Sequence, residues 1–168
     1  FFGSSQTLNE ETSALLDSLN KYKFLNSSKA LNYGLQALEI NDPGAISQDI
    51  TDINVVIGEV LFYQNNYAKS IEYYIAALNM HNLLPVKDRL HKYVNEPPWI
   101  LVALGNLYFK IERFEIAEKK YLEAVDNFNL LEEEFSIDKI NGLSTSKTNI
   151  AAIYSTKGDV KKAESKYK

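Results

Sequence analysis

The clearest hydrophobic pattern in the chain lies between Asn54 and Met80, where two apolar stripes flank a short polar turn. The apolar positions follow the 3.6-residue rhythm of a helix on both sides of the turn. They are Ile57, Leu61, Ile71, Tyr74, Ala77 and Leu78. Asn65-Asn66 separates the stripes, and asparagine tolerates the left-handed conformation that ends many helices. The pattern predicts a helical hairpin, with Gly58 and Ala77 as small residues where its two helices approach closely.

The same spacing recurs along the chain. A second copy has its large, small and aromatic positions at Leu104, Gly105, Tyr108, Phe114, Ala117, Tyr121 and Ala124. A third copy has Ile150, Ala151, Tyr154, Gly158, Asp159, Ala163 and Tyr167. A divergent upstream copy has Leu15, Leu19, Tyr22, Ala30, Gly34, Ala37 and Leu38. Because one hairpin cannot bury its apolar face alone, we expect neighbouring hairpins to stack.

These positions resemble tetratricopeptide repeats, helix–turn–helix units of about 34 residues with a Leu-Gly pair, spaced aromatics and spaced alanines. Ile57-Gly58 stands at the Leu-Gly pair, and Ser70 stands where the family usually has alanine. The resemblance implies an all-α fold, a right-handed α-solenoid of antiparallel helical hairpins.

The repeats are longer than the family average. The equivalent small residues Ala30, Ser70, Ala117 and Ala163 lie 40, 47 and 46 residues apart, against about 34 in the standard repeat. The surplus falls between the hairpins, at 41–52, 82–97 and 128–145. Such long repeats resemble the tetratricopeptide regions of bacterial signal-transduction regulators and sensor histidine kinases. In those proteins the array often precedes a membrane segment, a kinase domain or a DNA-binding domain.

The pattern predicts a leader or disordered terminus at residues 1–7 and a tetratricopeptide-like domain at 8–168. Its hairpins are expected at about 8–40, 43–81, 97–134 and 139–168, the last one truncated. Asp42-Pro43 and Glu96-Pro97-Pro98 are helix-start signals, because the fixed φ of proline suits the first helical turn. Phe1–Gln6 fits either a signal-peptide remnant or an untidy terminus. The short last hairpin predicts that the chain is part of a longer protein.

Composition narrows the possible partners. The net charge of −4 disfavours nucleic acid, which calls for a basic surface. No apolar run reaches the roughly 18 residues that a membrane-spanning helix needs. The chain has no cysteine, so it offers neither disulfides nor thiolate chemistry. This composition fits a cytoplasmic protein and an exported one equally well.

No catalytic or cofactor motif is found, and we expect no enzyme activity, cofactor or metal. His81 and His91 are ten residues apart across a proline-containing connection, which favours packed or solvated histidines over metal ligands. Glu132, Glu133 and Glu134 are consecutive on the predicted helix and point about 100° apart, so they form a solvated face rather than an acid–base pair. The basic end is read as a solvent face and comprises Lys157, Lys161, Lys162, Lys166 and Lys168.

The resemblance implies a binding groove, because the first helix of each repeat lines the concave surface in this family. The corresponding positions are Glu59, Phe62, Tyr63, Trp99, Val102, Asn106, Phe109 and Lys110. Their aromatic side chains provide the large contact area that suits a bound peptide or helix. The alternative for each residue is packing between repeats. Some members of the family hold the carboxylates of chaperone tails in a clamp that needs lysine and asparagine at set groove positions. The corresponding residues here are Asp52, Val56, Glu59, Trp99 and Ala103. The resemblance therefore disfavours a chaperone tail as the partner.

Two functional hypotheses remain. The first is a protein-interaction or sensory domain that binds a peptide, a partner helix or a downstream segment of its own chain. The second is a structural scaffold that self-associates, for example as a homodimer, through the apolar stripe of its last hairpin.

Overall fold

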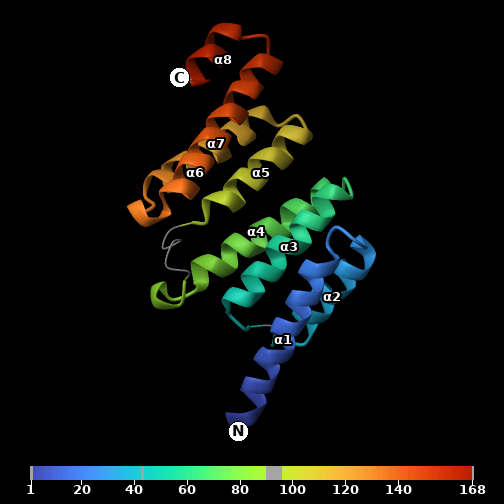
Figure 1. The fold of residues 1–168 in the computed structure, drawn as a ribbon. Coiled ribbons are helices and arrows are strands. Elements are labelled where there is room, and N and C mark those ends of the chain that lie inside the picture. Colours follow the sequence, from blue (N-terminus) through green and yellow to red (C-terminus); the bar gives the residue numbers. More distant parts are fainter. Residues whose placement is uncertain (1, 43, 90–95, 168) are drawn as a thin grey trace. The chain divides into compact units, whose positions relative to one another are not determined.

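The computed structural model describes residues 2–42, 44–89 and 96–167, and Phe1, Pro43, His91 and Lys168 lie outside them. The described residues form helices joined by turns (Figure 1). The α-helices are α1 (Phe2–Tyr22), α2 (Ser27–Glu39), α3 (Gln48–Tyr63), α4 (Tyr67–Leu83), α5 (Pro98–Lys110), α6 (Phe114–Asn129), α7 (Ser136–Thr156) and α8 (Val160–Tyr167). Short 3₁₀ helices are η1 (Val86–Asp88) and η3 (Glu133–Phe135). The expected all-α fold of helical hairpins is confirmed.

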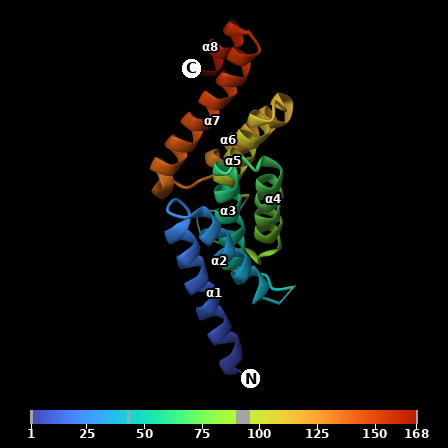
Figure 2. The ribbon, with the colours of Figure 1, turned by 90° about the vertical axis from the view of Figure 1, so that its right-hand side faces the viewer.

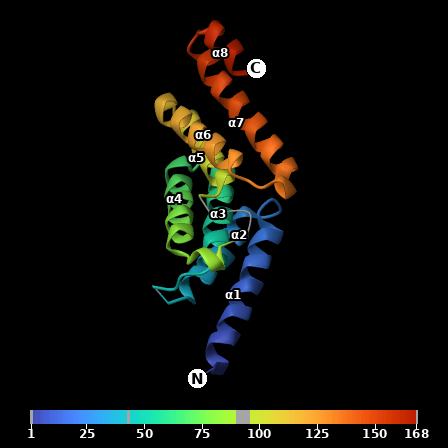
Figure 3. The same cartoon turned by 90° about the vertical axis from the view of Figure 1, so that its left-hand side faces the viewer.

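The chain divides into two compact units, unit 1 (Phe1–Arg89) and unit 2 (Leu90–Lys168). In unit 1, α1 packs on α2 and α3 packs on α4, while α3 also contacts α1 and α2. Two side views show α3 between α2 and α4 (Figure 2 and Figure 3). In unit 2, α5 packs on α6 and α7 on α8, while α7 also contacts α5 and α6. Each unit therefore stacks two hairpins.

One backbone geometry recurs in three turns, each following the first helix of a hairpin. Asn65, Glu112 and Gly158 have φ angles of 59°, 60° and 77°, in the left-handed region. The residue after each donates its N–H to the carbonyl five positions earlier, at 2.8 to 2.9 Å. This bond satisfies a carbonyl that the helix end would leave unpaired. The turn predicted at Asn65-Asn66 is confirmed.

Glycine lets an aromatic ring lie directly on the first helix of two hairpins. A Cβ atom added at Gly58 would lie 3.0 Å from the Tyr74 ring, and one at Gly105 would lie 2.4 Å from the Tyr121 ring. Both rings are buried. The hydroxyl of buried Ser70 also donates a hydrogen bond of 2.6 Å to the Gly58 carbonyl. The small residues of the repeat pattern thus set the helix spacing.

The start of α3 corrects the sequence prediction. The helix begins at Gln48 rather than at Asp42-Pro43. Ser47 caps it, because its hydroxyl accepts the N–H of Ile50 at 3.2 Å. Serine in extended backbone is a favoured N-cap, and here it prevails over the proline signal. At the other predicted start, Pro98 begins α5 as expected.

Two further boundaries differ from the prediction. The sixth helix ends at Asn129 rather than near Glu134, and the chain turns there between buried Phe128 and buried Leu131. Phe128 lies on Gly142 of α7, where an added Cβ would be 2.2 Å from the ring. Packing therefore overrides the helix-favouring glutamates. At the other end, α1 begins at Phe2, inside the segment where a leader was expected.

Candidate functional site

An open pocket of about 460 Å³ lies at one end of unit 1, where α1 turns into α2 and α3 ends. We call it the tip pocket. It is lined by Lys23, Phe24, Leu25, Asn26, Ser27, Tyr63 and Gln64. The side chain of Asn26 accepts the N–H of Lys29 at 3.0 Å and caps α2. Since α1 ends at Tyr22, this cap leaves Phe24 and Leu25 in a short turn between two helices.

The apolar side chains of the tip pocket are exposed. Phe24 is 67 % exposed, Leu25 75 % and Tyr63 61 %. The rings are nevertheless held, because Phe24 meets Tyr63 edge to face at 5.6 Å between centroids. Tyr63 also meets Phe62 at 5.6 Å, and Phe62 meets Tyr67 at 5.8 Å. Pre-positioned aromatic surface is the kind that binds a partner at low entropic cost.

An ion pair ties the tip pocket to α3. The Lys23 Nζ lies 2.8 Å from the Glu59 Oε2, and both side chains are partly buried. Lys23 also lies over the Phe24 ring at 5.0 Å from its centroid. Of the residues predicted from the repeat pattern, Tyr63 lines this pocket, while Glu59 and Phe62 contact its lining residues Lys23 and Tyr63.

Two more lysines lie over aromatic rings beside the tip pocket. Lys29 lies 4.0 Å from the centroid of Tyr22, which stacks on Tyr33 at 5.7 Å. Lys21 lies 5.6 Å from the Tyr22 centroid. The hydrogen bond with Lys29 lowers the pKa of Tyr22, and the same bond raises the pKa of Lys29. Lysine charge is thus concentrated on aromatic surface at this end of the unit.

In unit 2, the predicted groove residues Trp99 and Val102 pack against neighbouring helices. The indole Nε1 of Trp99 donates to the Asp138 Oδ1 at 3.2 Å, and its ring meets Phe128 edge to face at 5.0 Å. Val102 is only 3 % exposed. The anticipated alternative, packing between repeats, therefore describes the side chains of Trp99 and Val102 in this structure.

Asn106 also links helices within unit 2. Its Oδ1 accepts from the Tyr121 hydroxyl at 2.7 Å and from the Asn149 Nδ2 at 3.0 Å. Burial raises the pKa of Tyr121, so its hydroxyl stays a donor. Phe109 meets Phe114 edge to face at 5.4 Å, while Lys110 is exposed. Of the five predicted residues in unit 2, Lys110 presents its side chain most openly.

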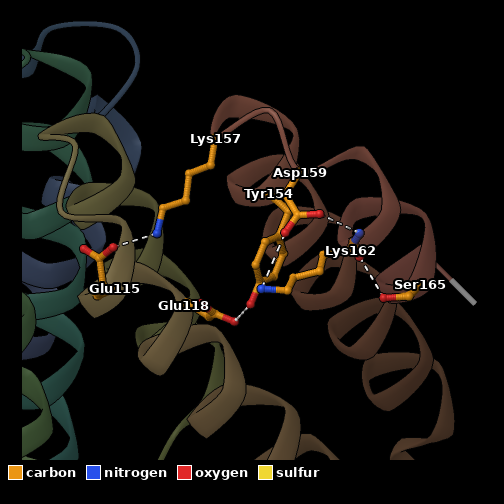
Figure 4. A network of polar contacts seen from close by, with 7 residues as sticks. All are labelled: Glu115, Glu118, Tyr154, Lys157, Asp159, Lys162 and Ser165. Carbon is orange, nitrogen blue, oxygen red and sulfur yellow. Dashed lines mark hydrogen bonds and ion pairs between the residues drawn. The ribbon is translucent and has the colours of Figure 1, made fainter.

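A polar network joins α6 to the α7–α8 turn (Figure 4). Lys157 pairs with Glu115 at 2.6 Å, which lowers the pKa of that carboxyl. The Tyr154 hydroxyl donates to Glu118, and this bond raises the pKa of Tyr154. Asp159 then accepts the backbone N–H of Lys162 at 3.2 Å. Lys157, from the predicted basic end, therefore pairs with a carboxylate of the preceding hairpin while it remains exposed to solvent.

The remaining candidate chemistry is structural. His81 is 1 % exposed. Its counterpart in the next repeat, 47 residues further along the chain, is the buried Phe128. Glu132, Glu133 and Glu134 are exposed around η3. Among the described residues, no group of three or more acidic or histidine side chains is placed to hold a metal ion. Within the same residues, no helix combines the length and apolarity that crossing a membrane requires.

Sequence reasoning missed most of the tip pocket, including Lys23, Phe24 and Leu25. Repeat alignment looks at helix faces, whereas these residues lie in and beside a turn. The available signal was the pair Phe24-Leu25 immediately before the capping Asn26. Large apolar residues in a turn have no helix face to pack against.

Comparison with known proteins supports the repeat assignment. Residues 51–80 match the family model for the tetratricopeptide repeat, and they cover most of the α3–α4 hairpin. Proteins of this family generally bind proteins or peptides and are typically non-enzymatic scaffolds. No curated protein matches the sequence.

Two solved structures have a similar fold. The crystal structure of BtubC (BKLC) from P. vanneervenii is 21 % identical with a TM-score of 0.77, and the match covers 92 % of this chain and 59 % of that one. The crystal structure of MamA is 14 % identical with a TM-score of 0.66, covering 93 % of this chain and 74 % of that one. Both matches show a similarity of fold.

Proposed function

We propose that the chain is a non-enzymatic protein- or peptide-binding module and that the tip pocket is its principal contact surface. The observation that carries this proposal is the exposure of Phe24, Leu25 and Tyr63 around one pocket. Exposed apolar side chains that gather in one place mark interaction sites more often than scattered ones do. Their edge-to-face contacts pre-position the rings for a partner.

Glu59 and Phe62 support this surface from behind. Glu59 holds Lys23 and Phe62 packs on Tyr63, so both act as positioning residues. Phe109 and Lys110 are proposed as a secondary contact in unit 2. Trp99, Val102 and Asn106 contribute to that unit's packing.

We also propose a cellular role for this binding module. The long repeats support a role as the sensory or regulatory part of a larger bacterial signalling protein, where a bound segment changes access to an attached domain. The bound segment would come from another protein or from a downstream part of the same chain. The coding sequence on both sides of this region tests the context. A membrane segment with a kinase or DNA-binding domain supports it, and further repeats alone contradict it.

The binding function is tested by selecting peptides from a random phage-displayed library with the full chain. We expect enriched peptides to lose about tenfold in affinity with Tyr63→Ala, as truncation of an aromatic anchor typically costs 1 kcal/mol or more. Lys161→Ala is the control, because it removes an exposed side chain of unit 2 that belongs to neither proposed contact. Circular dichroism checks that both variants keep their helices. Enrichment no higher than background, or binding indifferent to Tyr63→Ala and to Phe24→Ala, would contradict the proposal.

A scaffold that self-associates remains the second candidate, and one observation favours it. Leu130, Ile137 and Ile140 are 64 %, 76 % and 65 % exposed around the α6–α7 connection. If these side chains drive self-association, light scattering will show a mass that rises with concentration and falls with Ile137→Lys. A concentration-independent monomer excludes this candidate.

A further inference from the structure

Resting on the proposed function of the tip pocket, we infer that its partner is an acidic segment with one large apolar side chain. The apolar residue enters the tip pocket, and flanking carboxylates meet the lysines around it. The partner is a peptide segment of a protein, because the pocket is small and bordered by separate point charges.

The charges of unit 1 are segregated between its two ends. Four lysines lie in the turn after α1 or in the helix ends beside the tip pocket, and we call them the lysine end: Lys21, Lys23, Lys29 and Lys69. The carboxylate beside them is Glu59, already paired with Lys23. Two further carboxylates are near, because Asp17 precedes Lys21 by four residues on α1 and Glu72 follows Lys69 by three residues on α4. Four lysines against three carboxylates leave this end with a net charge of +1.

The opposite end of unit 1 is acidic, around the C-terminus of α2 and the N-terminus of α3. It carries Glu39, Asp42, Asp49 and Asp52. Hydrogen bonds confirm that these elements meet there, since Ser13 of α1 bonds Asp49 and Thr12 accepts from Asn41. A protein with a net charge of −4 therefore presents a locally positive end, which attracts and orients a negative partner.

The lysines keep their charge available to a partner. Lys29 and Lys21 lie over the face of Tyr22, where the π-electrons stabilise a cation without neutralising it. Lys23 is paired with Glu59. A carboxylate that approaches the aromatic face of this end therefore meets positive charge at Lys21 and Lys29.

The tip pocket itself suits a large apolar side chain. Phe24 and Tyr63 offer exposed ring surface, and the volume of about 460 Å³ exceeds that of one leucine or phenylalanine side chain. Ser27 and Gln64 belong to the same lining. They provide polar groups that can bond the backbone of an extended segment.

The test uses the full chain and designed fluorescein-labelled peptides, followed by fluorescence anisotropy. The parent peptide has one leucine flanked by glutamates. One companion replaces leucine with alanine, and another replaces every glutamate with glutamine. We expect the parent to bind and each companion to bind about tenfold more weakly. Binding of the parent should also weaken as salt rises, because the attraction is screened.

Protein variants identify the residues that provide the apolar contact and the charge attraction. Tyr63→Ala should weaken the parent peptide about tenfold and weaken the alanine companion little, because that companion lacks the anchor. The double variant Lys21→Gln, Lys29→Gln should weaken the parent about tenfold and leave the glutamine companion unchanged. Lys161→Gln, an exposed lysine of unit 2, is the control and should change neither.

Each contrary outcome has a distinct meaning. If the glutamine companion binds as tightly as the parent and Tyr63→Ala weakens both, the acidic partner is overturned and the proposed binding surface stands. If the alanine companion binds as tightly as the parent, the apolar anchor is overturned. If no peptide binds, or if binding ignores every variant in unit 1, both the inference and the proposed surface are overturned.

Discussion

Glu59 and Asn106 occupy the same repeat position, directly after the glycine that receives an aromatic ring, yet they face different neighbours. Glu59 reaches back to Lys23 of the preceding hairpin and supports an open pocket. Asn106 reaches forward to Asn149 of the following hairpin and closes a packed contact. The repeat position therefore fixes where a residue lies on its helix. The neighbouring hairpin determines whether its side chain supports an exposed surface or packs in the core.

Two other repeat positions show the same difference. Tyr63 is exposed beside the tip pocket, and its counterpart in the next repeat is Lys110. Trp99 is bonded to Asp138, whereas its counterpart Asp52 bonds Gln48 at 2.8 Å. Unit 1 thus exposes aromatic surface where unit 2 presents a charge, and unit 2 uses its tryptophan internally.

The largest expected effect contrasts the two glycines. Gly105→Ala should lower the free energy of unfolding by about 2–3 kcal/mol, because its Cβ would overlap a ring that cannot move easily. The Tyr121 ring is 1 % exposed and held through its hydroxyl by Asn106. Gly58→Ala should cost less than about 1 kcal/mol, because its 3.0 Å contact needs only a small shift and alanine favours the helix. Urea denaturation followed by circular dichroism measures both, and equal costs would contradict the contrast.

The next effect contrasts Asn106 with Glu59 directly. Asn106→Ala should destabilise unit 2 by about 2 kcal/mol, because it leaves the buried Tyr121 hydroxyl without its acceptor. Glu59→Ala should cost about 1 kcal/mol or less, as expected for an ion pair near the surface. Fluorescence of Trp99, the single tryptophan, follows unit 2 selectively. Adding Tyr121→Phe to Asn106→Ala should recover part of the loss, and no recovery would show that the bond contributes little.

The smallest effect compares the turns of the two units. Glu112→Gly should raise stability by up to about 1 kcal/mol, because glycine adopts the left-handed conformation without strain. Asn65→Gly should gain only a few tenths of a kcal/mol, since asparagine already tolerates that conformation. Thermal unfolding of the paired variants measures the difference. A larger gain at Asn65 than at Glu112 would contradict this explanation.

The hairpins were predictable from sequence because their cause is local and repeated. Gly58 with Tyr74 and Gly105 with Tyr121 mark close helix contacts, and Asn65 marks a helix end. The start of α3 was not predictable from Asp42-Pro43, because Ser47 provides a competing cap.

The candidate site was only partly predictable. Glu59, Phe62 and Tyr63 follow from the repeat alignment, but Phe24 and Leu25 belong to no helix face. Trp99 has the composition of a binding residue, and only its bond to Asp138 and its contact with Phe128 show that it packs between helices. Sequence periodicity identifies the face that one hairpin would expose on its own. The packing of the next hairpin determines whether that face is covered.

The central claim is that partners bind at the tip pocket of unit 1 while Trp99 stays in the packing of unit 2. Two-dimensional ¹H–¹⁵N NMR of the full chain, titrated with the glutamate-flanked leucine peptide, tests this most directly. The single indole N–H of Trp99 gives one distinct signal. We predict that the backbone signals of Phe24, Leu25 and Gln64 shift on titration and that the Trp99 indole signal does not. A shift of the indole signal with unchanged signals at the tip pocket would contradict the account.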